Sequence, residues 1–238
     1  MSKPGRIRKF KPSFENGGFW ESYKDMEIQF EDFLKYVPFI DRNERTCSFR
    51  LASLIYAIGS HIDSAFKEIA KSSKFSKKYP EILKTKKGKP RRTTIVDYFP
   101  IASEYKLDSR RVMFKQLPKR VILIPFQKYL KVATQIQTPD WWDCYNNVKH
   151  HFHESFEEAN LKNARDALAG AFLLNAVHTP AILRLYEFGT LKIDFLGKGI
   201  GEPAIEKVDK STVENILNRG QKWPFLLETE VFKYDYSQ

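Results

Sequence analysis

The sequence predicts a mainly α-helical bundle with small β additions. Apolar residues recur with helical spacing in two long segments before residue 71, and three helix-start patterns follow between residues 138 and 180. β-rich runs are confined to residues 112–126 and to the C-terminal tail. The 238 residues are 42% hydrophobic and 14% aromatic. That composition is enough to bury a sizeable core and excludes a disordered chain.

The two long segments each predict one amphipathic helix. Residues 20–37 place apolar side chains at i, i+3 and i+4, and Pro38 ends the pattern. Residues 45–70 continue one apolar stripe over a longer distance. Gly59 lies inside this second helix, where it lowers helix propensity but lets a neighbouring element approach closely.

The middle of the chain predicts shorter elements. Residues 94–105 suit a short helix interrupted by Pro100. Residues 112–126 contain two β-rich runs around Leu-Pro-Lys at 117–119, which predicts a small hairpin.

Three helix starts follow this hairpin. Residues 138–140 (Thr-Pro-Asp) supply an N-cap, a proline at the first helical position and an acid, and they predict a helix to about His153. Residues 155–158 (Ser-Phe-Glu-Glu) have capping-box spacing and predict the next helix. Residues 179–180 (Thr-Pro) predict a third, which Gly189 ends.

The tail has a different pattern. Residues 191–196 and 225–236 predict strands, with a capped helix from Ser211 to Asn218 between them. We therefore expect a helical domain over residues 1–190 and a small β-containing appendage over residues 191–238.

The net charge of +11 is concentrated in two segments. Residues 1–11 carry five Lys and Arg and no acid, and residues 71–92 carry ten against Glu81. Such segments are typical of proteins that bind a polyanion such as RNA; the alternative is a solvated loop that only aids solubility. The candidate nucleic-acid-binding residues are Lys84, Lys86, Lys87, Lys89, Arg91 and Arg92.

Several classes of protein are disfavoured. Two cysteines exclude a disulfide scaffold and a Cys-based zinc cluster, and they suit a reducing compartment. The longest apolar stretch, residues 167–177, is too short to cross a bilayer, and no secretory signal is evident. We therefore expect a cytoplasmic protein without membrane contact. Residues 197–201 (Gly-Lys-Gly-Ile-Gly) lack the GK[ST] ending of a phosphate loop and are interpreted as a Gly-rich turn.

One helix face carries most of the candidate chemistry. On a helix over residues 141–153, one polar stripe contains Asn146, Lys149, His150 and His153. A separate arc is expected to face the core and contains Trp141, Cys144, Tyr145, Val148 and Phe152.

The stripe suits cleavage of RNA without a metal. An imidazole titrates near neutral pH, so His150 can take the 2′-hydroxyl proton or protonate the leaving oxygen. Lys149 and Asn146 can hold a phosphate or a developing oxyanion. Two alternatives stay open: a metal site at His150 and His153, or at His151 with a distant partner, and a solvated face without chemistry.

The same region resembles a protein family. Residues 141–150 read W-W-x-x-Y-N-x-V-K-H, and residues 159–174 read A-N-L-x-N-A-x-x-A-L-A-G-x-F-x-L. Over about residues 20–178 the chain resembles prokaryotic proteins with HEPN-type domains. That resemblance implies a helical bundle. Many HEPN domains are metal-independent ribonucleases of toxin–antitoxin, abortive-infection and CRISPR systems, in which two copies form one site across a dimer interface.

By position, the resemblance makes His150 the motif histidine and Asn146 its polar partner. The family's arginine four to six residues earlier is absent, since Cys144 and Tyr145 stand there. Lys149 would supply the lost charge, although it lacks the planar fork of arginine.

On the following predicted helix, Asn160 and Asn163 either hydrogen-bond to the motif helix or lie in solvent. With Tyr145 and His153 they form the expected supporting set.

The expected function is a metal-independent endoribonuclease of toxin or anti-phage defence type. We expect it to be homodimeric, to act on RNA and to need no cofactor, and an antitoxin or defence-system protein is a further candidate partner. The alternative is a non-catalytic HEPN-like module that binds nucleic acid or a partner.

Overall fold

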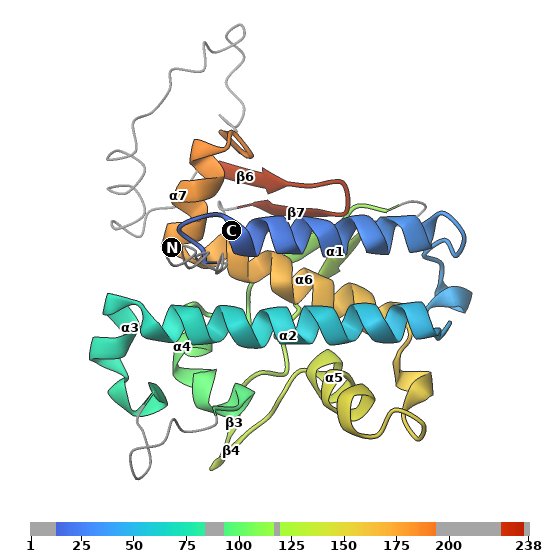
Figure 1. The fold of residues 1–238 in the computed structure, drawn as a ribbon, viewed down its shortest axis with the longest axis horizontal. Helices are drawn as coiled ribbons and strands as arrows, with labels where there is room; N and C mark the ends of the chain where they lie inside the picture. Colours follow the sequence, from blue (N-terminus) through green and yellow to red (C-terminus); the bar gives the residue numbers. More distant parts are fainter. Residues whose placement is uncertain (1–12, 84–92, 117–119, 194–224, 236–238) are drawn as a thin grey trace, which may run out of the picture.

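Three helices form the centre of the molecule (Figure 1). They are α1 (Gly18–Leu34), α2 (Phe49–Lys71) and α6 (Leu161–Val177), and each contacts the other two. The structure is a computed structural model that describes residues 13–83, 93–116, 120–193 and 225–235. A fourth helix, α5 (Asp140–His150), packs against α2 and α6. The predicted mainly α class with small β additions is confirmed.

The two N-terminal helices follow their predicted apolar stripes. Tyr23 and Phe30 of α1 are fully buried. α2 begins where the Ser48 hydroxyl accepts a hydrogen bond of 3.1 Å from the Leu51 amide. Gly59 of α2 is buried against another element, so its predicted role in allowing a close approach is confirmed.

The start of α6 differs from the prediction. Residues 156–158 form only a 3₁₀ turn, η4, and the Ser155 side chain makes no capping hydrogen bond. Asn160 is the N-cap instead, and its side-chain oxygen accepts a hydrogen bond of 3.0 Å from the Asn163 amide. The amide of Leu161 also donates to the Thr46 carbonyl at 3.0 Å. A contact distant in the sequence therefore fixes where α6 begins.

α5 is shorter than predicted. Pro139, not Thr138, is the N-cap, because the Thr138 hydroxyl donates to Asp143 at 2.6 Å without capping a backbone amide. The helix ends at His150. His153 therefore lies in the following turn, and the prediction that it continues the helical stripe is wrong.

Short helices complete the α part. They are α3 (Ser73–Lys78), α4 (Phe99–Glu104) and α7 (Thr179–Glu187), with 3₁₀ turns η1 (Asp41–Asn43), η2 (Pro80–Leu83) and η3 (Ile95–Tyr98). Pro100 lies in the first turn of α4, where a missing amide costs nothing, so it does not interrupt the helix. Gly189 follows α7 with a φ of 69°, the left-handed conformation expected at a helix end.

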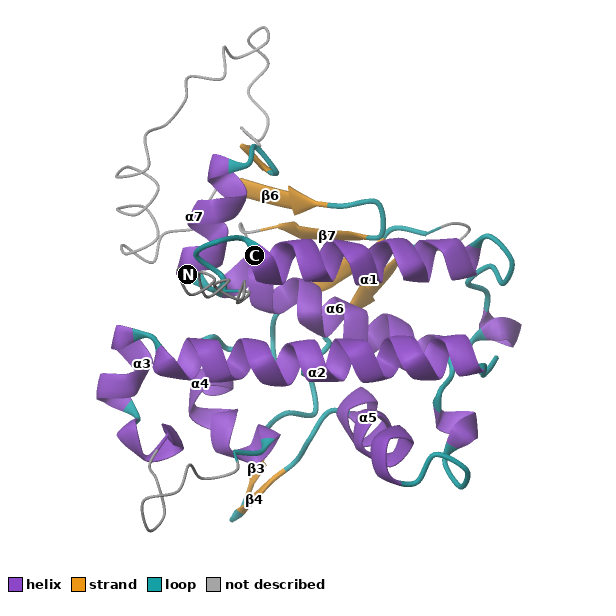
Figure 2. Ribbon diagram, in the orientation of Figure 1, coloured by secondary structure: helices purple, strands orange, loops and turns teal. Residues whose placement is uncertain are grey.

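Five short strands form one antiparallel sheet (Figure 2). Its order is β2 (Val121–Leu123), β1 (Val112–Phe114), β7 (Phe232–Asp235), β6 (Phe225–Glu228) and β5 (Leu191–Ile193). The predicted hairpin at 112–126 is confirmed as β1 and β2. The predicted strand over 225–236 is two strands, β6 and β7, paired as a hairpin. A separate ribbon pairs β3 (Lys131–Val132) with β4 (Gln135–Ile136).

The sheet joins segments from both sides of the domain boundary expected near residue 190. Phe114 of β1 pairs with Phe232 of β7, and both side chains are fully buried. The expected helix over 211–218 and the Gly-rich turn over 197–201 lie outside the described residues.

A buried carboxylate attaches the β6–β7 turn to α1. Glu27 is fully buried, and it accepts hydrogen bonds from the Tyr23 hydroxyl at 2.7 Å and from the Thr229 hydroxyl. Lys24 lies 2.5 Å from its other oxygen. These contacts satisfy a group that would be costly to bury alone.

None of the described helices has, by itself, the length and apolar character needed to cross a membrane. α6 and α7 meet that test only as a pair, which is bent by 84° at the break between them.

Candidate functional site

A cleft of about 680 Å³ lies between α5, η3 and α2. Asn146, Lys149 and His150 line it, which are the three candidate catalytic residues. Tyr145, from the expected supporting set, lines it as well. The structure therefore brings the core of the predicted polar stripe to one open surface.

The opposite face of α5 holds the helix in place. The Trp141 indole donates a hydrogen bond of 2.6 Å to the Pro125 carbonyl, and the Cys144 thiol donates to the Glu158 carbonyl at 3.1 Å. Burial raises the pKa of Cys144 to about 12, so this thiol stays protonated. The prediction that this arc faces the core is confirmed for Trp141, Cys144, Tyr145 and Val148.

Tyr145 connects α5 to α2. Its hydroxyl lies 3.4 Å from the Ser60 hydroxyl and accepts a hydrogen bond of 3.2 Å from the Lys149 ammonium. The same ammonium lies 5.3 Å from the centre of the Tyr145 ring, a distance at which the ring attracts a cation. Lys149 is therefore held beside the cleft although its side chain is exposed.

Asn146 and His150 carry polar groups that are not engaged by other side chains among the described residues. Asn146 is half-buried and His150 is exposed. Within the described part of the chain, neither side chain has a hydrogen-bond partner or an ion pair. Both groups are therefore available to a ligand in the cleft.

The other walls were not predicted from the sequence. On α2, Asp63 and Lys67 form an ion pair of 2.5 Å, and both line the cleft. On η3, Thr94 and Asp97 form a capping box that fixes the turn. The signals were present as an acid–base pair at i and i+4 and as Thr-x-x-Asp, but neither indicates that these segments face α5.

Three expected supporting residues lie outside the cleft. His153 lies in the turn after α5, with its ring 5.7 Å from that of Phe152. Asn160 caps α6, and Asn163 donates a hydrogen bond of 2.8 Å to the Glu158 carbonyl. Asn147, which no sequence pattern marks, donates a hydrogen bond of 3.0 Å to the Glu158 carboxylate and so links α5 to η4. The two expected asparagines therefore shape the connection between α5 and α6. Asn163 also hydrogen-bonds to the Cys144 thiol of α5, as the first of the two alternatives predicts, whereas Asn160 serves as the N-cap of α6.

The nucleic-acid-binding candidates Lys84, Lys86, Lys87, Lys89, Arg91 and Arg92, and the basic residues 1–11, lie outside the described residues. In the sequence, Arg92 directly precedes Thr93, which lines the cleft.

No group of three or more His, Cys, Asp or Glu side chains is placed to hold a metal ion in the described ranges.

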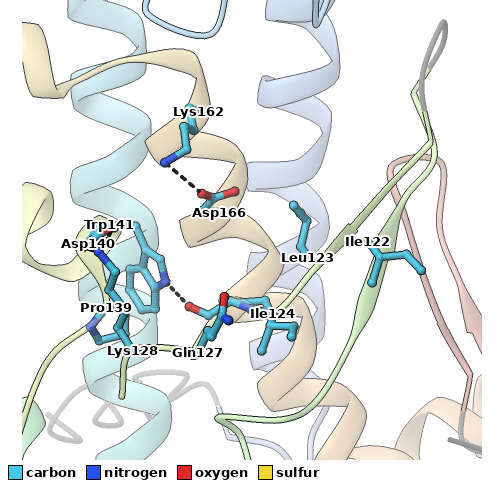
Figure 3. A pocket seen from close by; sticks show the side chains of 11 residues that line it. Ile122, Leu123, Ile124, Gln127, Lys128, Pro139, Asp140, Trp141, Lys162 and Asp166 are labelled. Atoms are coloured by element: carbon cyan, nitrogen blue, oxygen red, sulfur yellow. Dashed lines mark hydrogen bonds and ion pairs between the residues drawn. The ribbon is translucent and has the colours of Figure 1, made fainter. Parts of the chain in front are cut away.

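A smaller cavity of about 270 Å³ lies between β2 and the start of α5 (Figure 3). Its charged groups are paired with one another: Lys128 contacts Asp140 at 2.8 Å, and Lys162 lies 4.0 Å from Asp166. Because these charges already have partners, this cavity is a weaker candidate than the α5 cleft.

Comparisons of the chain with protein-family models, with curated proteins and with solved structures found no match.

Proposed function

We propose that the α5 cleft binds the sugar–phosphate backbone of RNA and cleaves it without a metal ion. The proposal rests mainly on one observation: His150, Lys149 and Asn146 line the same cleft. Lys149 hydrogen-bonds to Tyr145, whereas the side chains of His150 and Asn146 have no hydrogen-bond partner among the described residues. An ammonium and an amide suit a phosphate, and an imidazole beside them suits proton transfer.

The proposed reaction is transesterification by the neighbouring 2′-oxygen. Neutral His150 takes the 2′-hydroxyl proton, the 2′-oxygen bonds to phosphorus, and the bond from phosphorus to the 5′-oxygen breaks. Lys149 or water returns a proton to that 5′-oxygen. The products are a 2′,3′-cyclic phosphate and a 5′-hydroxyl, with no oxidant or cofactor involved.

Charge in the sequence supports RNA as the ligand. Residues 84–92 contain six Lys and Arg and no acid, and they directly precede Thr93 at the cleft. Lys67 and Lys149 line the cleft itself. Neutralised phosphates would make binding depend steeply on salt.

The proposal includes a homodimer in the cytoplasm. The resemblance to HEPN proteins implies a site built from two copies, and His150 is the one histidine on the described walls of the cleft. A second copy would supply a second imidazole, which would return the proton to the 5′-oxygen in place of Lys149 or water. Both cysteines are free thiols, as suits a reducing compartment. Light scattering after size-exclusion chromatography tests the mass, and an antitoxin or defence partner would co-purify from the native host.

Cleavage is tested with 5′-labelled structured and single-stranded RNAs in the presence of EDTA. We expect cuts by the wild type, no cuts by His150→Ala, and a cyclic-phosphate end by mass spectrometry. His151→Ala is the matched control, because His151 is exposed one residue away and does not line the cleft. Equal loss in both variants contradicts the assignment of His150.

The non-catalytic binding module is the second candidate, favoured by the absence of an arginine at the position where the HEPN motif has one. It predicts retention of uncut RNA at low salt, weakened by Lys149→Gln but not by Lys35→Gln at the exposed end of α1. Wild-type protein that neither cuts nor retains RNA would overturn both functions.

A further inference from the structure

A second hollow lies on the other side of α2. It has a volume of about 440 Å³ and is formed by α1 and α2. α1 contributes Phe19 and Ser22, whereas α2 contributes a row of side chains that includes Ser60, Ser64 and Lys71. No role in the proposed reaction uses this hollow.

The hollow adjoins the α5 cleft across the exposed face of α2. Lys67 lines both depressions. Ser60 lines the hollow, and its hydroxyl lies 3.4 Å from that of Tyr145, which lines the cleft. Ser64, one turn further along, is exposed and small. The boundary between the two depressions is therefore formed by serine hydroxyl groups and by Lys67, which is paired with Asp63.

The lining of the hollow suits parts of a nucleotide. Serine hydroxyls can donate to or accept from a ribose or phosphate group, although the Ser64 hydroxyl already donates to the Ser60 carbonyl at 2.9 Å. Lys71 adds positive charge beside Glu68, and Lys67 adds its charge as part of an ion pair with Asp63. The Phe19 ring supplies an apolar wall. Polar and apolar surfaces in one depression match a sugar with its base better than a free anion.

His61 gives independent support. It lines the hollow and is more than nine-tenths buried, and its Nε2 has no hydrogen-bond partner among the described residues. Its Nδ1 lies 3.3 Å from the Ser22 hydroxyl. Burial lowers the pKa of His61 to about 4, so the ring is neutral at physiological pH. The Nε2 atom is itself enclosed, so a base or ribose hydroxyl in the hollow would satisfy it once the ring turns toward the ligand.

We propose that single-stranded RNA runs from the α5 cleft across the Ser60–Ser64 face of α2 into the hollow between α1 and α2. This inference rests on the proposed binding of RNA at the cleft. A helix with its side chains is about 10–12 Å wide, so a strand with a stacked spacing of about 3.4 Å per nucleotide needs roughly four nucleotides to cross it. Strands shorter than this reach the cleft alone.

The test measures the affinity of 2′-O-methyl RNA, which is not cleaved, by titration calorimetry at low salt. Trinucleotides occupy the cleft alone, whereas nonanucleotides reach both depressions. We expect tighter binding of the nonanucleotide. Ser64→Glu should weaken it about tenfold, by repulsion and steric block, and leave the trinucleotide unchanged. Ser53→Glu is the matched control, since Ser53 is exposed on α2 and lines neither depression.

A second measurement follows the ring nitrogens of His61 by NMR. We expect their resonances to shift with the nonanucleotide and not with the trinucleotide. Equal effects of Ser64→Glu and Ser53→Glu, or equal affinities for both lengths, overturn the path across α2. If the trinucleotide still binds in a manner that requires Lys149, the proposed function survives that result. If neither length binds the wild type, both proposals fail together.

Discussion

The ring of Tyr145 lies directly on the backbone of Gly59, so close that a β-carbon there would be 2.3 Å from the ring. This contact lets α5 approach α2 and places Tyr145 between Ser60 and Lys149. The absence of a side chain at Gly59 therefore determines how closely α5, which forms one wall of the cleft, approaches α2, which forms another.

Gly59→Ala should lower the free energy of unfolding. Alanine favours a helix over glycine by about 1 kcal/mol, but overpacking of a core contact costs about 1–3 kcal/mol and the ring must move. We expect a net loss in urea unfolding. The double variant with Tyr145→Ala should lose less than the two single changes added together. A more stable Gly59→Ala protein would contradict the contact.

Asn160→Ala should cost about 1 kcal/mol, the usual value of an N-cap, because the Asn163 amide loses its acceptor. Ser155→Ala should change stability by less than 0.5 kcal/mol on the scale of ordinary surface substitutions, since Ser155 caps no helix. The pair is compared by urea unfolding. If the two variants lost equal amounts of stability, this would contradict Asn160 as the N-cap of α6 and would favour a helix start at Ser155.

Stability should fall as the pH is lowered from 6.5 to 5. Burial lowers the pKa of His61 to about 4 and that of His178 to about 3, from a usual 6.5. The unfolded chain therefore takes up protons in this window and the folded chain does not, which favours unfolding. Each histidine should contribute about 1.5 kcal/mol. His61→Leu should remove about half of this pH dependence in urea unfolding, and an unchanged slope would refute its contribution.

Thr229→Val should loosen the β6–β7 hairpin. Valine keeps the shape of threonine but removes the hydroxyl that donates to the buried Glu27 carboxylate. Glu27 keeps the hydrogen bond from the Tyr23 hydroxyl, and the loss of one hydrogen bond to a charged group costs about 1.5–3 kcal/mol. We expect faster hydrogen exchange at the amides of β7. Thr229→Ser retains the hydroxyl and should exchange nearly as slowly as the wild type, so similar acceleration in both would rule out the hydrogen bond as the cause.

Local sequence patterns predict a helix well where the burial of one apolar face determines its extent. The apolar stripes of α1 and α2 match the structure to within a few residues, because only one face of each helix meets the core. The start of α6 was misplaced because the amides of Leu161 and Lys162 bond to the carbonyls of Thr46 and Glu44. No spacing within residues 155–163 reveals that pairing.

The candidate site, like the fold, can be predicted from the sequence only in part. Asn146, Lys149 and His150 were predicted to lie together, since one helix carries all three. The walls from α2 and η3 depend on tertiary packing, which a single sequence does not encode in any local motif. His153 does not continue the polar stripe, because α5 ends at His150 and His153 lies in the turn that follows.

The central position of β7 has a consequence for how the protein forms during synthesis. β7 lies between β1 and β6, so the β1–β2 hairpin leaves the ribosome long before the strand that completes its open edge. Until Phe232 arrives beside Phe114, that edge exposes unpaired backbone groups to other chains. Translation stalled before residue 232 should therefore yield a nascent chain that depends on chaperones, even though its helices are already complete.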